Sequence, residues 1–246
     1  MSGRLFIVAT PIGNLEDMTL RALRVLKEAD LIAAEDTRHT GLLLAHFGIQ
    51  VPQASYHKFN EQQRLQEFLG RLQSGAKIAL VSDAGMPGVS DPGERLIRAC
   101  VEAGVAVEVV PGPSAVLHAL VGSGMKITPF YFGGFLPVKG GARQKELAAA
   151  GARECTSVYF ESPYRLLRTL EDCAAVIPAR TVAVARELTK KFEEIRRGTG
   201  GDLLAHYRAA KVRGEITFLV EGMRQGGPRM EEAVLPEDAE GLSSEE

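Results

Sequence analysis

The feature that most constrains the fold is a regular alternation of short apolar runs with longer amphipathic segments in the first half of the chain. The runs are read as strands at 4–10, 31–36, 54–57, 77–83 and 105–110, and the segments between them have helical spacing. Strands that alternate with helices predict a parallel sheet with helices on both faces. The first half is therefore predicted to be an α/β domain.

Glycine and proline gather where three of these strands end. The segments are TPIGN (10–14), SDAGMPGVSDPG (82–93) and PGPSA (111–115). One such loop would be ordinary turn chemistry. Because ligands of open parallel sheets bind beyond the carboxyl ends of the strands, three such loops at one edge predict the floor of a binding site.

Two aspartates are predicted to start helices. Asp17 is placed as the N-cap of a helix over 18–28, and Asp91 as the N-cap of a helix with Pro92 in its first position. On this interpretation the second half of SDAGMPGVSDPG serves the helix. Its first half, where Gly85 and Gly88 let the backbone approach a ligand closely, is the predicted cradle.

The second half predicts another α/β domain, with a mixed sheet. Strands are predicted at 156–161, 181–187 and 215–222, an extended segment at 190–199, and helices near 141–150, 163–176 and 201–210. A linker is placed at about 121–128. The predicted domains are 1–122 and 123–225, followed by an acidic tail at 226–246 that is predicted to be disordered.

The charge is unevenly distributed. The chain of 246 residues has a net charge of −2, yet residues 124–225 hold 17 Lys and Arg against 11 Asp and Glu. A basic half indicates a polyanionic partner, although scattered surface charges would give the same excess. No apolar run reaches the ~20 residues of a membrane span. Three cysteines without CxxC spacing predict reduced thiols in a cytoplasmic protein.

Common nucleotide and metal motifs are absent from the sequence. There is no GxGxxG, GxxxxGK[ST], HExxH or GxSxG pattern and no Cys/His cluster, so no metal is expected. Polar segments instead follow predicted strands, at 35–40, 56–61, 161–165 and 186–194. Each also has a structural explanation: a helix N-terminus for EDTR, a structural role for His57, and a solvated charge run for RELTKKFEE.

Eight segments in fixed order resemble one family. They are VATPIGNLEDMT, AEDTR, SYHKFNE, LVSDAGMPGVSDPG, PGPSA, FGGFLP, ESPYR and RELTKKFEE. Over about residues 4–222 the chain resembles the rRNA-methylating members of the tetrapyrrole (corrin/porphyrin) methylase superfamily. It differs from longer members in that a short acidic tail replaces their additional C-terminal segment, which leaves open any role of that segment in RNA docking.

The resemblance implies two α/β domains with a cleft that binds S-adenosylmethionine, and a homodimer without a membrane segment. The implied reaction is methylation of a cytidine ribose 2′-hydroxyl in the decoding region of small-subunit rRNA, as naked RNA or in the assembled 30S subunit. The methyl-donor contacts that it implies are Pro11, Ile12, Ser82, Asp83, Met86, Ser114, Ala115, Phe160, Glu161, Leu188 and Thr217.

A ribose hydroxyl is a poor nucleophile while protonated, so a base or an alkoxide-stabilising cation is expected in the cleft. Polar residues at strand ends are the candidates: Glu35, Asp36, Arg38, His57, Asn60, Glu187 and Lys190. Glu35 or Asp36 would accept the proton, while Arg38 and Lys190 would bind phosphate. Candidate contacts to the RNA backbone are Arg143, Lys145, Arg165, Arg168, Arg186, Lys190, Lys191, Arg196 and Arg197.

Two other functions fit the same fold. A methyltransferase acting on a tetrapyrrole would share the architecture, and an RNA-binding assembly factor would keep the fold without catalysis. The sequence also predicts different roles for the two aspartates of the 82–93 loop. Asp83→Ala is expected to weaken S-adenosylmethionine binding, whereas Asp91→Ala is expected mainly to lower stability.

Overall fold

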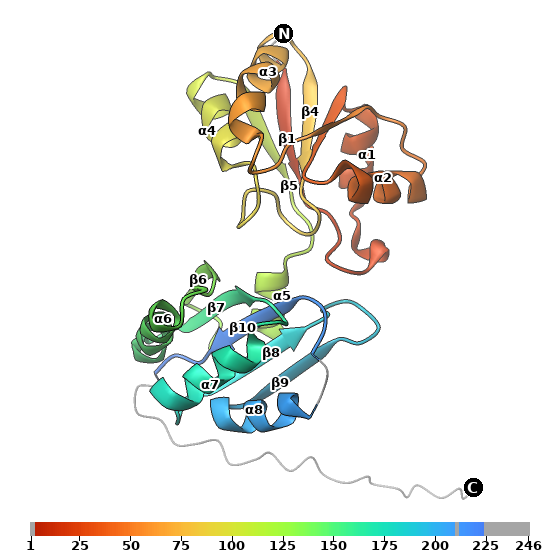
Figure 1. The fold of residues 1–246 in the computed structure, drawn as a ribbon. Helices are drawn as coiled ribbons and strands as arrows, with labels where there is room; N and C mark the ends of the chain where they lie inside the picture. Colours follow the sequence, from red (N-terminus) through yellow and green to blue (C-terminus); the bar gives the residue numbers. More distant parts are fainter. Residues whose placement is uncertain (1–2, 210–211, 224–246) are drawn as a thin grey trace, which may run out of the picture.

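The computed structural model describes residues 3–209 and 212–223, in two α/β lobes that each contain a five-stranded sheet (Figure 1). The tail predicted at 226–246 lies outside the described residues. Within the described ranges, no helix is both long and apolar enough to cross a membrane.

The sheet of the first lobe is entirely parallel, as predicted. Its strands have the order β3-β2-β4-β1-β5. They are β1 (Arg4–Val8), β2 (Leu31–Ala34), β3 (Gln53–Ser55), β4 (Lys77–Val81) and β5 (Ala106–Val110). Because all five run the same way, their carboxyl ends lie at one edge, and Figure 1 shows this edge facing the second lobe.

Two layers of helices cover this sheet because successive side chains of a strand point to opposite faces. Phe6 and Val8 pack with α1 (Leu20–Glu28) and α2 (Thr37–His46). Leu5 and Ile7 pack on the other face, with α3 (Glu61–Gln73) and α4 (Glu94–Glu102). The apolar runs of the sequence are therefore strands buried on both sides.

Both predicted helix caps are wrong. Thr19 caps α1, with its Oγ1 accepting the Ala22 N–H at 3.1 Å, and Asp17 belongs to the preceding 3₁₀ turn η1 (Leu15–Asp17). The N-cap of α4 is Gly93, with φ +139°, and a Cβ there would lie 2.8 Å from Leu80 Cδ2. Only glycine fits this turn against β4, so the helix begins at Glu94 and Asp91 is left outside it.

The sheet of the second lobe is mixed, also as predicted, with the order β6-β7-β10-β8-β9. Only β6 and β7 are parallel; the other pairs are antiparallel. Its strands are β6 (Phe130–Phe135), β7 (Thr156–Glu161), β8 (Thr181–Arg186), β9 (Glu194–Thr199) and β10 (Ile216–Val220). One face packs against α6 (Gly140–Ala152), α7 (Leu166–Val176) and α8 (Gly200–Arg208).

Helix α5 (Ala115–Gly122) covers the other face of the second sheet. Its Val116, Ala119 and Leu120 share a core with Val158 of β7 and Leu219 of β10. Figure 1 shows the helix on the second lobe. The chain therefore crosses between the lobes at Pro111–Ser114, before the helix, while the predicted division at 122/123 falls at its end and stays a prediction.

Candidate active site

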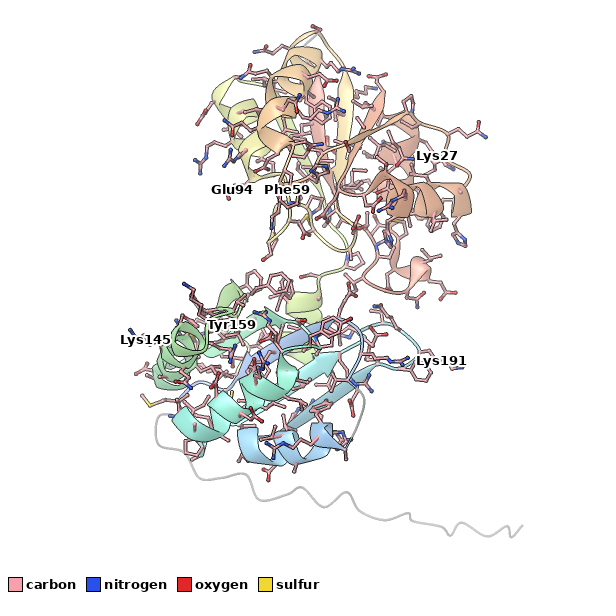
Figure 2. All side chains as sticks on the ribbon, in the orientation of Figure 1. Lys27, Phe59, Glu94, Lys145, Tyr159 and Lys191 are labelled. Atoms are coloured by element: carbon pink, nitrogen blue, oxygen red, sulfur yellow. The ribbon has the colours of Figure 1, made fainter. Side chains whose placement is uncertain are left out.

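A cavity of about 420 Å³ lies between the two lobes. Its walls come from the loops after β1, β2, β4 and β5 of the first lobe, and from the end of β6 and the segments around β7, β8 and β10 of the second. Figure 2 shows side chains of both lobes projecting toward the space between them. The edge at which the sequence placed the binding floor is the edge that the cavity occupies.

Most of the residues implied as methyl-donor contacts line this cavity. From the first lobe and α5 they are Ile12, Asp83, Met86, Ser114 and Ala115. From the second lobe they are Phe160, Glu161, Leu188 and Thr217. Pro11 and Ser82 are buried and do not line the cavity. For all eleven residues implied by the family resemblance, contact with the methyl donor stays a prediction.

Backbone hydrogen bonds hold the floor of the cavity. The Thr10 N–H donates to the Gly85 carbonyl at 2.9 Å, and the Gly85 N–H donates back to Thr10 at 3.1 Å. Gly85 has φ +78°, and a Cβ there would touch the Ile12 side chain at 3.4 Å. These bonds join the TPIGN and SDAGMPG loops, which predicts that both loops keep their shape when a ligand binds.

Three carboxylates from the first lobe line the cavity: Glu35, Asp83 and Asp91. Asp83 Oδ1 accepts the Asp36 N–H at 3.1 Å, and the Asp83 N–H donates to Glu35 Oε2 at 3.4 Å. Burial, aided by the charge of Asp83, raises the pKa of Glu35. Burial and the charges of Glu35 and Asp83 raise the pKa of Asp91 to about 6, against a hydrogen bond from Ser82.

The second lobe adds two carboxylates that already have partners. Glu161 is 3% exposed, and its carboxylate accepts hydrogen bonds from the Ser162 N–H, the Thr169 hydroxyl and Arg165 at 2.5–2.6 Å. Glu215 pairs with Lys190 at 2.8 Å. No Lys, Arg or His is among the lining residues found in the described part of the chain. The cavity is acidic, which favours a cationic ligand over a phosphate.

Of the seven predicted catalytic residues, the structure brings only Glu35 to the cavity. Asp36 caps α2 and pairs with the exposed Arg38 at 2.7 Å, and these bonds lower the pKa of Asp36. Asn60 accepts the His57 N–H at 2.8 Å and donates to Ser55, so it closes the turn after β3.

Glu187 and Lys190 have a structural role in the loop after β8. Lys190 Nζ lies 3.0 Å from Glu187 Oε1, and despite partial burial this bond helps lower the pKa of Glu187. A Cβ on Gly13 would lie 2.4 Å from Lys190 Cγ and 2.9 Å from the Leu188 carbonyl. The loop therefore packs directly on the TPIGN loop and helps hold the lobes together.

Sequence reasoning missed two lining residues that bear on chemistry. Asp91 was assigned to a helix cap, yet it lines the cavity. Phe135 also lines it, from the end of β6. Phe135 belongs to the FGGFLP motif, which is the available sequence signal for it.

The basic residues predicted to contact RNA fall into two groups. Five are held by partners within the protein: Arg143 by Asp172, Arg165 by Glu161, Arg186 by Glu194, Lys190 by Glu187, and Arg197 by the Ser123 and Gly122 carbonyls. Lys145, Arg168 and Lys191 are exposed, and Arg196 is exposed beside Glu194. The internal partners of the first group reduce the number of cations that are free to contact RNA, although Arg197 itself is exposed.

The geometry and the sequence place the chain in a known class. The family model of the Tetrapyrrole (Corrin/Porphyrin) Methylases matches residues 4–204, so the chain belongs to this family. Similar solved structures include the methyltransferase CobJ, with a TM-score of 0.67 and 21% identity over 92% of this chain and 98% of that one. A uroporphyrin-III C-methyltransferase from Thermus thermophilus, complexed with S-adenyl homocysteine, has a TM-score of 0.63 at 19% identity, with 89% and 97% covered.

The curated relatives of this chain identify a smaller group within this family. Proteins named Ribosomal RNA small subunit methyltransferase I are 49% identical in Synechocystis sp., over 89% of this chain and 79% of the relative. In Escherichia coli O157:H7 the identity is 49%, over 96% and 82%. In Thermotoga maritima it is 46%, over 89% and 99%. These identities place the chain in the ribosomal RNA small subunit methyltransferase I group, as the resemblance of its motifs predicted.

Proposed function

We propose that this protein transfers a methyl group from S-adenosylmethionine to a cytidine ribose 2′-hydroxyl in the decoding region of small-subunit rRNA. The observation that carries the proposal is an acidic, partly apolar cavity between the two lobes of a tetrapyrrole methylase fold. The name shared by relatives of 44–49% identity supports rRNA as the acceptor over a tetrapyrrole. The homodimer and the cytoplasmic location are part of this proposal and rest on the family resemblance.

The lining residues fit S-adenosylmethionine. A cavity of about 420 Å³ is within the range of small-molecule sites. The donor carries an ammonium and a sulfonium, and Asp83 offers a carboxylate to balance them. Leu188, Met86 and Phe160 offer apolar surface for the adenosine. Within the described ranges no group of three or more His, Cys, Asp or Glu side chains is placed to hold a metal ion.

Exposed aromatic side chains close to the cavity suit an RNA acceptor. Phe135 lines the cavity and is 58% exposed, and Tyr164, next to the lining residue Pro163, is 95% exposed. Phe59 is 89% exposed in the loop after β3, with Lys58 Nζ 5.5 Å from its ring (Figure 2). Because single-stranded RNA is recognised by stacking of its unpaired bases, such rings are suited to hold a nucleotide at the cleft.

The decisive experiment maps ribose methylation in small-subunit rRNA from cells with and without this protein. One decoding-region cytidine is expected to lose its 2′-O-methyl group when the protein is absent. Purified protein, incubated with naked 16S rRNA or with 30S subunits from the deficient cells, then identifies which of the two is the substrate. Unchanged methylation at every site would refute the proposal, and titration with S-adenosylmethionine separates an enzyme from a binding factor, which would give no heat.

The exposed cations of the second lobe provide a test of RNA binding. The triple variant Lys145→Ala, Arg168→Ala, Lys191→Ala is expected to weaken binding at all sequences. Because each lost phosphate contact removes released counterions, the slope of log K against log salt should flatten by roughly 0.7–0.9 per contact. Lys145 and Lys191 lie on opposite sides of the second lobe in Figure 2, so the footprint tested is broad.

The matched control changes three cations of the first lobe, on α1 and α4: Arg24→Ala, Lys27→Ala and Arg98→Ala. It alters the net charge by the same amount, and we expect its slope to stay that of the wild type. An equal change of slope in both variants would show that overall charge, rather than a surface on the second lobe, determines binding.

A further inference from the structure

Asp91 is free of the structural role that its sequence context predicts. Gly93 is the N-cap of α4, and Asp91 lines the cavity. The backbone has positive φ on both sides of it, +68° at Ser90 and +139° at Gly93. The positive φ strains the backbone at Ser90, which is not a glycine. Backbone strain of this kind is typical of functional sites.

Each other carboxylate near the cavity is committed to a partner. Glu161 is saturated by three donors and Glu215 pairs with Lys190. Asp83 accepts the Asp36 N–H, which orients it at the start of α2. Glu35 accepts the Asp83 N–H. Asp91 differs from these carboxylates. Its hydrogen-bond partner is the Ser82 side chain, and among the described residues no backbone N–H or cation pairs with it.

We propose, on the basis of the proposed function, that Asp91 is the general base that accepts the proton of the acceptor hydroxyl, and that Glu35 is a positioning residue that tunes it. When bound, S-adenosylmethionine supplies an electrophilic methyl group: the hydroxyl oxygen bonds to the methyl carbon, the carbon–sulfur bond breaks, and its electron pair goes to sulfur. The Asp91 carboxylate takes the hydroxyl proton, becomes a neutral carboxylic acid, and returns the proton to water.

The surroundings of Asp91 suit this task. Glu35 at the end of β2 and Asp83 at the end of β4 face the same space, and Glu161 and Glu215 line it from the second lobe. Burial, together with the charges of Glu35 and Asp83, disfavours the ionised form of Asp91, so its pKa of about 6 lies near neutral pH. A base is most effective when its pKa lies close to the working pH, because it is then both ionised and basic.

The test compares Asp91→Asn with Glu94→Gln, a carboxylate three residues away whose side chain is 77% exposed and pairs with Arg98. Single-turnover methyl transfer to the rRNA is measured with saturating S-adenosylmethionine between pH 5 and 8. Asp91→Asn is expected to slow transfer by roughly 10²–10⁴-fold and to remove the rise in rate through pH 6. Glu94→Gln is expected to keep both the rate and its pH dependence.

Glu35→Gln distinguishes the base from its neighbour. Because removal of a nearby negative charge lowers the pKa of Asp91, the rise in rate should move to lower pH in this variant. If the rise instead disappears in Glu35→Gln and persists in Asp91→Asn, the base is Glu35 and the assignment is overturned.

Thermal unfolding, measured without ligand or RNA, tests whether Asp91 is buried beside Glu35 and Asp83. The pKa of Asp91 is higher in the folded than in the unfolded protein, so ionisation of Asp91 lowers the stability of the fold as pH rises through 6. Asp91→Asn should therefore melt at a higher temperature than wild type above pH 7, and at the same temperature near pH 3, where Asp91 is protonated in both states. An equal melting temperature at every pH would contradict the placement.

The outcomes separate this inference from the proposed function. Wild-type protein that transfers no methyl group to RNA overturns the proposed function, and with it the role of Asp91. Wild-type transfer that Asp91→Asn does not slow overturns the role of Asp91 alone. The sequence predicts that Asp91→Ala mainly lowers stability. The role proposed for Asp91 predicts instead that removing its charge, as in Asp91→Asn, raises the stability of the fold at neutral pH.

Discussion

Replacing Arg143 with alanine is expected to lower the free energy of unfolding of the second lobe by about 3–5 kcal/mol. The Arg143 side chain is 6% exposed and the Asp172 side chain 12%. Its Nη2 lies 2.6 Å from Asp172 Oδ2, and its Nη1 donates to the Val138 carbonyl at 3.2 Å. The variant leaves the Asp172 carboxylate buried without its cation, and that uncompensated charge causes most of the loss.

Lys145, two residues along the same helix, is the matched control. It is exposed, so Lys145→Ala is expected to change stability by less than about 0.5 kcal/mol. Denaturant unfolding followed by circular dichroism measures both variants. The double variant Arg143→Met, Asp172→Leu should recover much of the stability, because it removes both charges together. An Arg143→Ala variant as stable as Lys145→Ala would contradict the structural assignment of this pair.

Arg143 and Lys145 show why the RNA-binding surface was only partly predictable. Both lie on α6 and carry the same charge, and the sequence gives no partner for either. The partner of Arg143 is Asp172, 29 positions away on α7. A count of charges establishes that the second half is basic, but only the packing of α6 on α7 decides which cations are available to a ligand.

The fold was more predictable than the helix starts. Apolar periodicity located the strands because burial on two faces leaves a continuous apolar run, as in β1 and β4. The N-caps of α1 and α4, Thr19 and Gly93, depend on the backbone conformation of the turn before each helix. At Gly93 the deciding contact is with Leu80, a residue of another element, and no local pattern reports it.

The same contact explains the error at the active site. Ser-Asp-Pro-Gly is a good sequence for starting a helix, so the sequence predicts a structural role for Asp91. Delaying the helix to Glu94 releases Asp91 to the cavity, where it faces Glu35 and Asp83. The floor at the carboxyl ends of the strands follows from topology alone, whereas the side chains that reach into it depend on where each loop turns.

Asp83→Asn is expected to weaken S-adenosylmethionine binding by roughly 10- to 100-fold, measured by isothermal titration calorimetry. The proposed reason is the loss of a negative charge facing the ammonium or sulfonium of the donor. Asparagine keeps an oxygen that can accept the Asp36 N–H, which Asp83 accepts at 3.1 Å, so the loop and the start of α2 should keep their positions. Asp83→Ala removes this acceptor as well, and a larger loss of affinity is expected.

Asp30→Asn is the control for charge alone. Asp30 lies at the opposite edge of the same sheet, where it also accepts a backbone N–H, that of Lys77 at 2.7 Å. The two substitutions thus remove the same charge from equivalent hydrogen-bonding environments, one at the cavity and one far from it. Wild-type affinity is expected for Asp30→Asn. If Asp83→Asn also binds with wild-type affinity, the acidic wall of the cavity does not recognise the charge of the donor, and backbone groups of the Gly85 and Ser114 loops must supply the binding energy instead.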